Sequence, residues 1–308
     1  MKWWMKWGIS YTFAHLPYGK PLYERVLRRF GELGQVASSS RFENAETLLD
    51  MARRHCDRID RLHAVEIGTG WIPAVPLGFM LAGARVDTFD ISRLAADDLF
   101  LQTRQTLATR IDGLARASGI APDILRQRLE DIGQAPAFDA ACRILGGSYH
   151  APYDTASLPL ADGEADLVIS NLVLQCVPRD LLPPLLQESW RVLKPGGVAL
   201  HRIRMSDEYA PAGSGAGRNH LEYLKYSDES WNRWFNHSLK HLNRLRAPQF
   251  MELFEEHGFT CLECNRNIDT DSIPFLQRLE IAPPFRQMSW EDLATVAIDV
   301  ALKKVLVP

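Results

Sequence analysis

A short apolar run that ends in two closely spaced glycines constrains the fold of this chain more than any other segment. Residues 64–70 read Ala-Val-Glu-Ile-Gly-Thr-Gly, and a second apolar run, residues 85–90, ends in Asp90. A short apolar run bounded by glycine is typical of a buried strand that leads into a tight turn. Because glycine has no side chain, the backbone at Gly68 and Gly70 can approach a neighbouring group or ligand closely. Two such strands predict the start of a sheet that is covered by helices.

The remainder of the chain continues this alternation of strands and helices. Apolar periodicity predicts helices at 21–30, 43–55, 75–81, 181–193 and 247–257, and strands at about 62–67, 85–90, 144–151, 165–171, 198–204, 258–264 and 297–305. Short apolar strands that alternate with helices are typical of a parallel sheet with helices on both faces. The predicted fold class is therefore α/β, with a doubly wound, Rossmann-like sheet.

Three segments do not fit the simple alternation. Residues 1–61 look helical, residues 93–142 are helical and polar and longer than an ordinary crossover, and residues 206–248 mix aromatic and polar groups. We predict an N-terminal helical cap or lid over 1–61 and a core over 62–308. The core would carry an inserted helical pair at about 93–142 and a second insert at about 206–248.

Composition excludes several classes of protein. A length of 308 residues with 46% hydrophobic residues allows one large core, and a net charge of −3 gives no reason to expect nucleic acid as a partner. No apolar run reaches the roughly 18 residues that span a bilayer, so no stable membrane span is expected. Five cysteines, an odd number, suit the reducing cytoplasm, and Cys261 and Cys264 lack further ligands for a metal. The oligomeric state is left open.

The first seven residues, Met-Lys-Trp-Trp-Met-Lys-Trp, are basic and aromatic. Polar residues interrupt the following segment, so it lacks the apolar core of a signal peptide. Two interpretations remain, a lid or packing helix and an interfacial contact with a membrane.

The position of Asp90 indicates the kind of ligand that the glycine turn serves. Asp90 ends the second strand about twenty residues after Gly70. A carboxylate at this spacing can accept hydrogen bonds from both hydroxyls of a ribose, while the glycines allow close approach of the backbone. The pair predicts a site for a nucleoside-containing cofactor.

Further motifs follow in a fixed order. They are Val65-Glu-Ile-Gly-Thr-Gly70, Asp154-Thr-Ala-Ser-Leu-Pro159, Asp162-Gly-Glu-Ala-Asp-Leu-Val-Ile-Ser-Asn-Leu-Val-Leu174 and Trp190-Arg-Val-Leu-Lys-Pro-Gly-Gly197. In this order the chain resembles the class I S-adenosylmethionine-dependent methyltransferases over about 62–204, with a weaker likeness over 247–305. The resemblance implies a seven-stranded sheet, mostly parallel with an antiparallel last strand, and S-adenosyl-L-methionine as the cofactor.

The resemblance also implies roles for individual residues. Asp90 would bind the ribose, Asp154 the adenine amino group, and Glu66 the amino-acid end of the cofactor beside Gly68 and Gly70. Glu66 could equally be a structural carboxylate, and Asn171, at the end of the fourth strand, could contact the cofactor or cap the next helix.

The sequence departs from the family pattern at one position. Ile72 stands where the family often has a third glycine, and Pro73 follows it. A nicotinamide-dependent dehydrogenase, the natural competitor, would need glycine or alanine near position 73 and a free N–H toward its pyrophosphate. Proline supplies neither, which favours methyl transfer.

Large inserts around a plain core predict an enclosed pocket for a small molecule. Oxygen of a sugar or secondary metabolite is the first expected methyl acceptor, and nitrogen of an amine or amino-acid derivative the second. A third alternative is a non-catalytic binding or scaffold protein, although the retained Gly68, Gly70 and Asp90 argue against it.

An oxygen or ammonium acceptor must lose a proton during methyl transfer. The candidate bases are His201, on the strand at 198–204, and His237, which lies four residues before His241 on one face of an expected helix. The candidate substrate-binding residues combine aromatic rings with guanidinium groups that suit an acidic acceptor: Tyr11, His15, Arg204, Trp231, Arg244 and Arg246.

Overall fold

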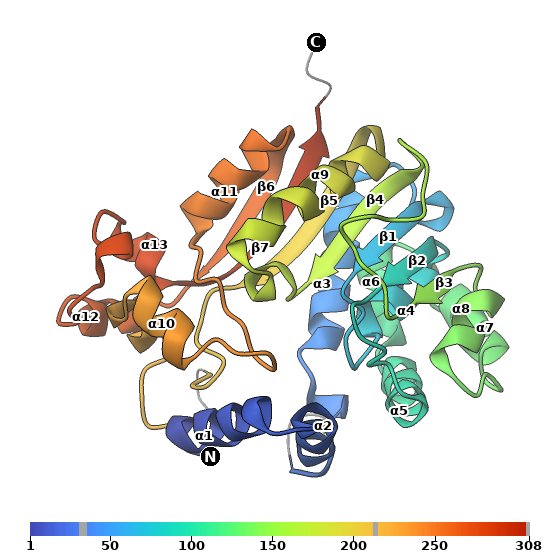
Figure 1. Ribbon diagram of the computed structural model, residues 1–308. Coiled ribbons are helices and arrows are strands. Elements are labelled where there is room, and N and C mark those ends of the chain that lie inside the picture. Colours follow the sequence, from blue (N-terminus) through green and yellow to red (C-terminus); the bar gives the residue numbers. More distant parts are fainter. Residues whose placement is uncertain (31–35, 212–214, 306–308) are drawn as a thin grey trace.

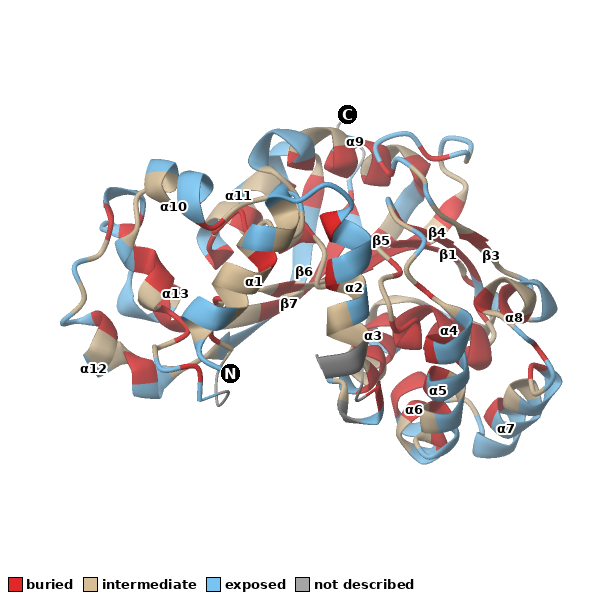
Figure 2. Ribbon diagram, turned by 60° about the horizontal axis from the view of Figure 1, so that its bottom comes forward, coloured by how far each residue is buried: buried red, intermediate tan, exposed pale blue. Residues whose placement is uncertain are grey.

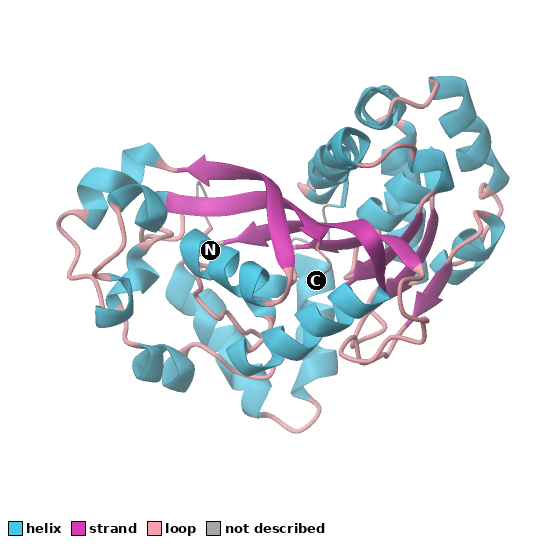
Figure 3. Cartoon of the chain, turned by 90° about the horizontal axis from the view of Figure 1, so that it is seen from above, coloured by secondary structure: helices cyan, strands magenta, loops and turns pink. Residues whose placement is uncertain are grey.

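The computed structural model describes residues 1–30, 36–211 and 215–305. Its centre is a seven-stranded sheet of order β3-β2-β1-β4-β5-β7-β6, with helices on both faces (Figures 1 and 3). Neighbouring strands from β3 to β5 are parallel, whereas β7 is antiparallel to both β5 and β6. The expectation of a doubly wound seven-stranded sheet with an antiparallel last strand is confirmed.

The strands are β1 (His63–Ile67), β2 (Arg85–Phe89), β3 (Ser148–His150), β4 (Ala165–Asn171), β5 (Leu193–Arg204), β6 (Phe259–Ile268) and β7 (Thr295–Lys304). The α-helices are α1 (Trp3–His15), α2 (Gly19–Phe30), α3 (Arg41–His55), α4 (Ala74–Ala82), α5 (Asp97–Ala108), α6 (Ile111–Ser118), α7 (Pro122–Asp131), α8 (Phe138–Ile144), α9 (Leu182–Val192), α10 (Asp228–Trp234), α11 (Ala247–Glu256), α12 (Ile273–Leu276) and α13 (Trp290–Ala294).

Alternate residues of the central strands build two separate cores. Ala64 and Leu167 face the helices α3, α4 and α6, whereas Val65 and Val168 belong to a second cluster with α9 and α11. Successive side chains of a strand point to opposite faces, so apolar runs in β1 and β4 place both faces in hydrophobic surroundings. Figure 2 shows the resulting buried band through the sheet.

The segment at 93–142 contains four helices, α5 to α8, and not the expected pair. Gly119 adopts a φ of +75°, a left-handed conformation that ends α6, and Pro122 begins α7. Glycine and proline therefore divide one apolar stripe into short helices.

Part of the predicted cap belongs to the core. In α3, Leu48 and Leu49 are fully buried among residues of α4 and α6. Of the helices in the predicted cap, α1 and α2 lie apart from the sheet, at the lower edge of the molecule in Figure 1.

A third cluster, which includes the buried Tyr223, Trp231 and Phe285, lies beyond the end of β5 and the start of β7. It unites the 206–248 segment with α12 and α13, and Trp3 and Trp7 of α1 pack against it. The expected helix through His237 and His241 is absent, because α10 ends at Trp234 and His237 forms an isolated bridge with Lys240.

None of the helices in residues 1–30, 36–211 and 215–305 has the length and apolar character needed to cross a membrane.

Candidate cofactor and acceptor site

Asp90 connects the loops that follow β1 and β2. The Gly70 N–H donates to Asp90 Oδ2 at 2.8 Å, and the Ser92 N–H donates to Oδ1 at 2.9 Å. Only 6% of Asp90 is exposed, and burial raises the pKa of its carboxyl while the two N–H groups oppose that shift. Each carboxylate oxygen can accept a second hydrogen bond, so Asp90 can still receive the hydroxyls of a ribose.

The two glycines serve different purposes. A Cβ on Gly68, at a φ of +83°, would lie 2.3 Å from Val173 Cγ2, so the packing of the protein itself requires glycine there. Gly70 has a φ of +67°, and a Cβ built on it would meet nothing within 4 Å. Gly70 therefore borders open space directly beside Asp90, which fits the expected cofactor cradle.

Glu66 is a buried carboxyl behind this edge. It is 1% exposed, and the hydroxyl of Thr88 donates to its Oε2 at 2.5 Å. Burial raises the pKa of Glu66 to about 8, since the hydrogen bond from Thr88 only partly offsets the loss of solvation.

Asn171 and Asp154 lie at the ends of β4 and β3. Asn171 Oδ1 accepts a hydrogen bond from Asn44 Nδ2 of α3 at 2.9 Å, and the next short helix has no side-chain cap. The capping alternative for Asn171 is therefore wrong. Asp154 is exposed, and its Oδ1 accepts the Ala156 N–H at 3.0 Å.

The helix α2 contacts the loops on either side of Asp90. Lys20 Nζ donates to Ser92 Oγ at 3.0 Å, and the guanidinium of Arg28 lies 5.5 Å from the ring centre of Trp71, next to Gly70. Charged side chains of α2 thus connect the N-terminal segment to the loops that carry Gly70 and Asp90. We call these loops the cofactor edge, after the ligand expected there.

His201 is a core residue, which corrects its expected role as a base. It is 0% exposed, its ring stacks on Phe254 of α11, and Ser170 Oγ lies 2.8 Å from its Nδ1. Burial lowers the pKa of His201 to about 3, so the ring is neutral and has no path to an acceptor.

His237 has both ring nitrogens engaged. The hydroxyls of Tyr209 and Ser10 each donate to a backbone carbonyl, so they accept from His237 Nε2, which lies 3.1 and 3.2 Å away. Nδ1 accepts the Leu239 N–H at 3.3 Å, which leaves no lone pair for a substrate proton. Burial, with Lys240 and His15 nearby, lowers the pKa of His237 to about 4. The residue joins α1 to the insert and is not placed to act as a base.

Three of the expected substrate ligands are structural, which corrects their assignment. Trp231 is 2% exposed in the third cluster, and Arg244, also 2% exposed, pairs with Asp228 and donates to the Tyr226 carbonyl. Arg246 is 0% exposed and donates to the carbonyls of Met205 and Leu293 at 2.6 and 2.8 Å, besides other acceptors.

Tyr11 and His15, the other two expected ligands from the N-terminus, lie together at the end of α1. Their ring centres are 4.3 Å apart, and Tyr11 is 6.3 Å from His237. His15 Nδ1 lies 2.8 Å from the Tyr11 carbonyl and therefore donates to it. The neutral ring then carries its free lone pair on Nε2, and His15 is exposed.

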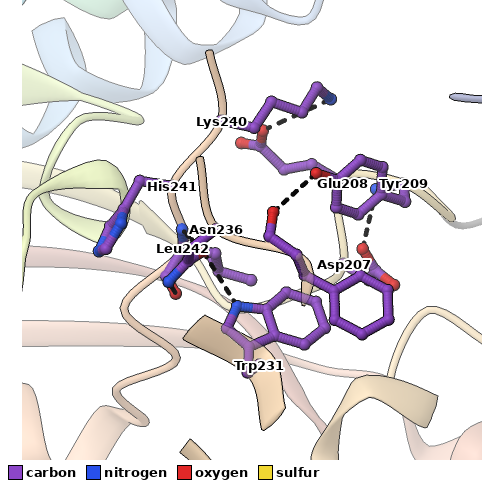
Figure 4. Close-up of a pocket in the computed structure, with 9 residues that line it drawn as sticks. Asp207, Glu208, Tyr209, Trp231, Asn236, Lys240, His241 and Leu242 are labelled. Atoms are coloured by element: carbon purple, nitrogen blue, oxygen red, sulfur yellow. Dashed lines mark hydrogen bonds and ion pairs between the residues drawn. The ribbon is translucent and has the colours of Figure 1, made fainter. Parts of the chain in front are cut away.

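Arg204 lies at the end of β5 beside an acidic residue that sequence reasoning missed. Glu208 Oε1 is 3.9 Å from Arg204 Nη1, and Glu208 Oε2 is 4.0 Å from Lys240 Nζ (Figure 4). No motif marks this group, because Lys240 comes from the far end of the insert. The neighbouring cavity, which Trp231 and Glu208 help to line, measures about 10 Å³, room for one water and too little for a substrate.

Part of this chain matches the model of a known family. The family described as "Methyltransferase domain" matches residues 124–201, which include β4, α9 and most of β5. The fold is that of an α/β protein, and the edge with Gly70 and Asp90 is where such a fold is expected to hold a nucleoside-containing cofactor. The family match over residues 124–201, together with this fold, supports an S-adenosylmethionine-dependent methyltransferase, an enzyme whose cofactor is S-adenosylmethionine.

Solved structures of similar proteins have low sequence identity to this chain. A candidate sarcosine dimethylglycine methyltransferase from Galdieria sulphuraria is 14% identical, with a TM-score of 0.48 over 85% of this chain and 86% of that one. An S-adenosylmethionine-dependent methyltransferase from Mesorhizobium loti is 17% identical, with a TM-score of 0.46 over 87% and 100%. Phosphoethanolamine N-methyltransferase 2 from Haemonchus contortus is 14% identical, with a TM-score of 0.46 over 92% and 60%. No curated protein sequence matches this chain.

Proposed function

We propose that this methyltransferase acts on a small molecule, and that it methylates an oxygen of a sugar or secondary metabolite. Nitrogen of an amine or amino-acid derivative is the second candidate. The observation that carries the proposal is the open space at Gly70 beside the buried Asp90, with α2 held against the same loops. An edge covered by helices suits a small acceptor better than a flat macromolecular surface.

The cofactor would be held from both ends. The carboxylate of Asp90 would accept hydrogen bonds from the ribose hydroxyls, and that of Asp154 would accept one from the adenine amino group. Glu66 and Asn171 would flank the methionine end near Gly70. When bound, S-adenosylmethionine supplies an electrophilic methyl group on a sulfonium. The protein contributes position, because holding donor and acceptor in line lowers the barrier by several kcal/mol.

We assign the role of base for an oxygen acceptor to His15, which sequence reasoning named only as a substrate ligand. Its Nδ1 is fixed by the Tyr11 carbonyl, so Nε2 can accept a proton. Imidazole is the commonest general base in enzymes. Arg204 and Glu208 would position polar groups of the acceptor at the end of β5.

Loss of the Asp90 carboxylate tests the cofactor site. Asp90→Ala should weaken binding of S-adenosylmethionine about a hundredfold, because two hydrogen bonds to a charged group disappear. Titration calorimetry measures this. The control is Asp123→Ala, whose side chain is 94% exposed on α7 and which should bind normally. Equal affinity of both variants would refute the assignment of Asp90.

The acceptor is tested by measuring S-adenosylhomocysteine release with matched alcohols and amines. We expect turnover with hydroxyl acceptors, and His15→Asn should lower kcat at least about tenfold while cofactor affinity stays unchanged. Turnover of amines alone would replace the oxygen proposal with the nitrogen one. An unchanged kcat in His15→Asn would remove His15 as the base.

A further inference from the structure

The exposed apolar side chains of this protein gather at its N-terminus. Of the fifteen large apolar or aromatic side chains that are exposed in the described residues, six lie within residues 1–22: Met1, Trp4, Met5, Leu16, Tyr18 and Leu22. Exposed Trp234 adjoins them, because Trp7 Nε1 donates to its carbonyl at 2.7 Å. We call these seven side chains the cap surface. Such a concentration marks an interaction site, since single scattered apolar residues are ordinary on a protein surface.

The helix α1 is apolar on two sides, and the protein covers only one of them. Trp3 and Trp7 pack against the third cluster, and Ser10 is fully buried on the same side. Trp4 and Met5 point away, with 56% and 41% of their surface exposed. A helix that is apolar all round is normally enclosed by hydrophobic material on every side. The outer side of α1 therefore lacks a partner within the described residues.

The same segment concentrates positive charge. Residues 1–30 contain six basic residues and one acid, Glu24, a formal charge of +5 in a chain whose total is −3, so the remaining residues carry −8. Lys20 and Arg28 contact the cofactor loops, whereas Lys2 and Arg25 are exposed. The charge of the cap segment thus opposes that of the rest of the molecule.

We propose that the cap surface docks the protein on an anionic lipid membrane. Tryptophan and tyrosine favour the boundary between headgroups and acyl chains, and basic residues beside them attract anionic headgroups. A second copy of the chain fits less well, because a symmetric interface would bring two segments of charge +5 together. Since α2 contacts Ser92, docking would bring the cofactor edge close to the lipid surface.

Sedimentation with vesicles tests the proposal without any turnover, so its outcome is independent of the proposed function. The full-length protein should bind vesicles of phosphatidylcholine with one third phosphatidylglycerol and should bind pure phosphatidylcholine much more weakly. Added salt should weaken binding, because it screens the headgroup charge. Equal binding to both vesicles, or to neither, would overturn the proposal.

Two variants and a matched control identify the surface. The double variant Trp4→Ala with Met5→Ala should lower vesicle binding on the order of tenfold through lost apolar burial. Lys2→Glu with Arg25→Glu should lower it at least about tenfold and reduce its salt dependence. Trp290→Ala, which removes a tryptophan that is 42% exposed on α13, should bind like the unaltered protein.

Analytical ultracentrifugation separates the lipid proposal from self-association. A monomer that binds vesicles supports the proposal. A dimer that dissociates in the Trp4/Met5 variant would show that a second copy covers the cap surface, and would overturn it. Vesicle binding that falls equally in Trp290→Ala would also overturn it.

Discussion

At the scale of single residues, two buried carboxyl groups with different surroundings meet at the cofactor edge. Asp90 accepts two backbone N–H groups, whereas Glu66 has a hydroxyl donor from Thr88 and feels the negative charge of Asp90. The pKa of Glu66 is about 8, so the carboxyl is mostly protonated at neutral pH. A cationic group beside Glu66 would favour the ionised form and lower that pKa.

Binding of S-adenosylmethionine should therefore release a proton if Glu66 faces its cationic end. Below pH 8 the free carboxyl holds a proton that the complex gives up, so affinity should rise with pH, by up to about tenfold per unit between pH 6 and 8. Above pH 8 the free group is already ionised, and the rise should end. Calorimetry at pH 7 in two buffers of different ionisation enthalpy measures the proton. In the Glu66→Gln variant the affinity for S-adenosylmethionine should no longer depend on pH. If that variant still releases a proton on binding, the proton comes from another group.

At the scale of elements, segments with strong local signals could be predicted from the sequence. Residues 165–171 are a strand as expected, because an apolar run follows a turn, and α4 ends where Gly83 adopts a φ of +102°. The spacing of His237 and His241 predicted a helix, and this prediction was wrong. The segment is a loop that is fixed by contacts from Ser10 and Tyr209. Ser10 precedes His237 by 227 residues, and local sequence carries no information about so distant a partner.

Arg246 provides the test of how the insert is held. Its guanidinium donates to several buried backbone carbonyls in residues 205 and 292–295, and so ties the end of β5 to the segment before β7. Arg246→Ala should lower the free energy of unfolding by about 3 kcal/mol or more, because the buried acceptors lose their donors. Urea denaturation measures this. Arg204→Ala, at a partly exposed site, should stay within about 0.5 kcal/mol and should affect turnover instead. Equal stability of the two variants would contradict the structural role of Arg246.

At the scale of the whole molecule, the two sides of the candidate site differ in how far the sequence predicts them. The cofactor side, from Gly68 to Asp90, lies within one local β-α-β unit and was recognisable from spacing. The proposed acceptor side combines α1, the end of β5 and the insert, which only the folded chain brings together. Arginines of the insert looked like ligands for an anion, but Arg244 and Arg246 bind the protein itself.

The core should fold without the N-terminal helices α1 and α2. Among the residues that the structure describes, neither of the two clusters on the sheet contains one before Val36. A chain that begins at Val36 should therefore still unfold cooperatively, as circular dichroism would record. Its affinity for S-adenosylmethionine should fall roughly two- to tenfold, because the loop at Ser92 loses the hydrogen bond from Lys20. Loss of the cooperative transition would show that the cap is an integral part of the core.

The position of β7 has a consequence for synthesis on the ribosome. Along its length β6 is hydrogen-bonded to β7, which in turn pairs with β5, and β7 ends at Lys304. Residues 259–268 therefore leave the exit tunnel before the strand that joins them to the sheet, and they stay unpaired until residues 295–304 have been translated. A nascent chain that stalls before residue 295 would expose an open edge at β5, and that edge would be vulnerable to proteases and to pairing with other unfinished chains.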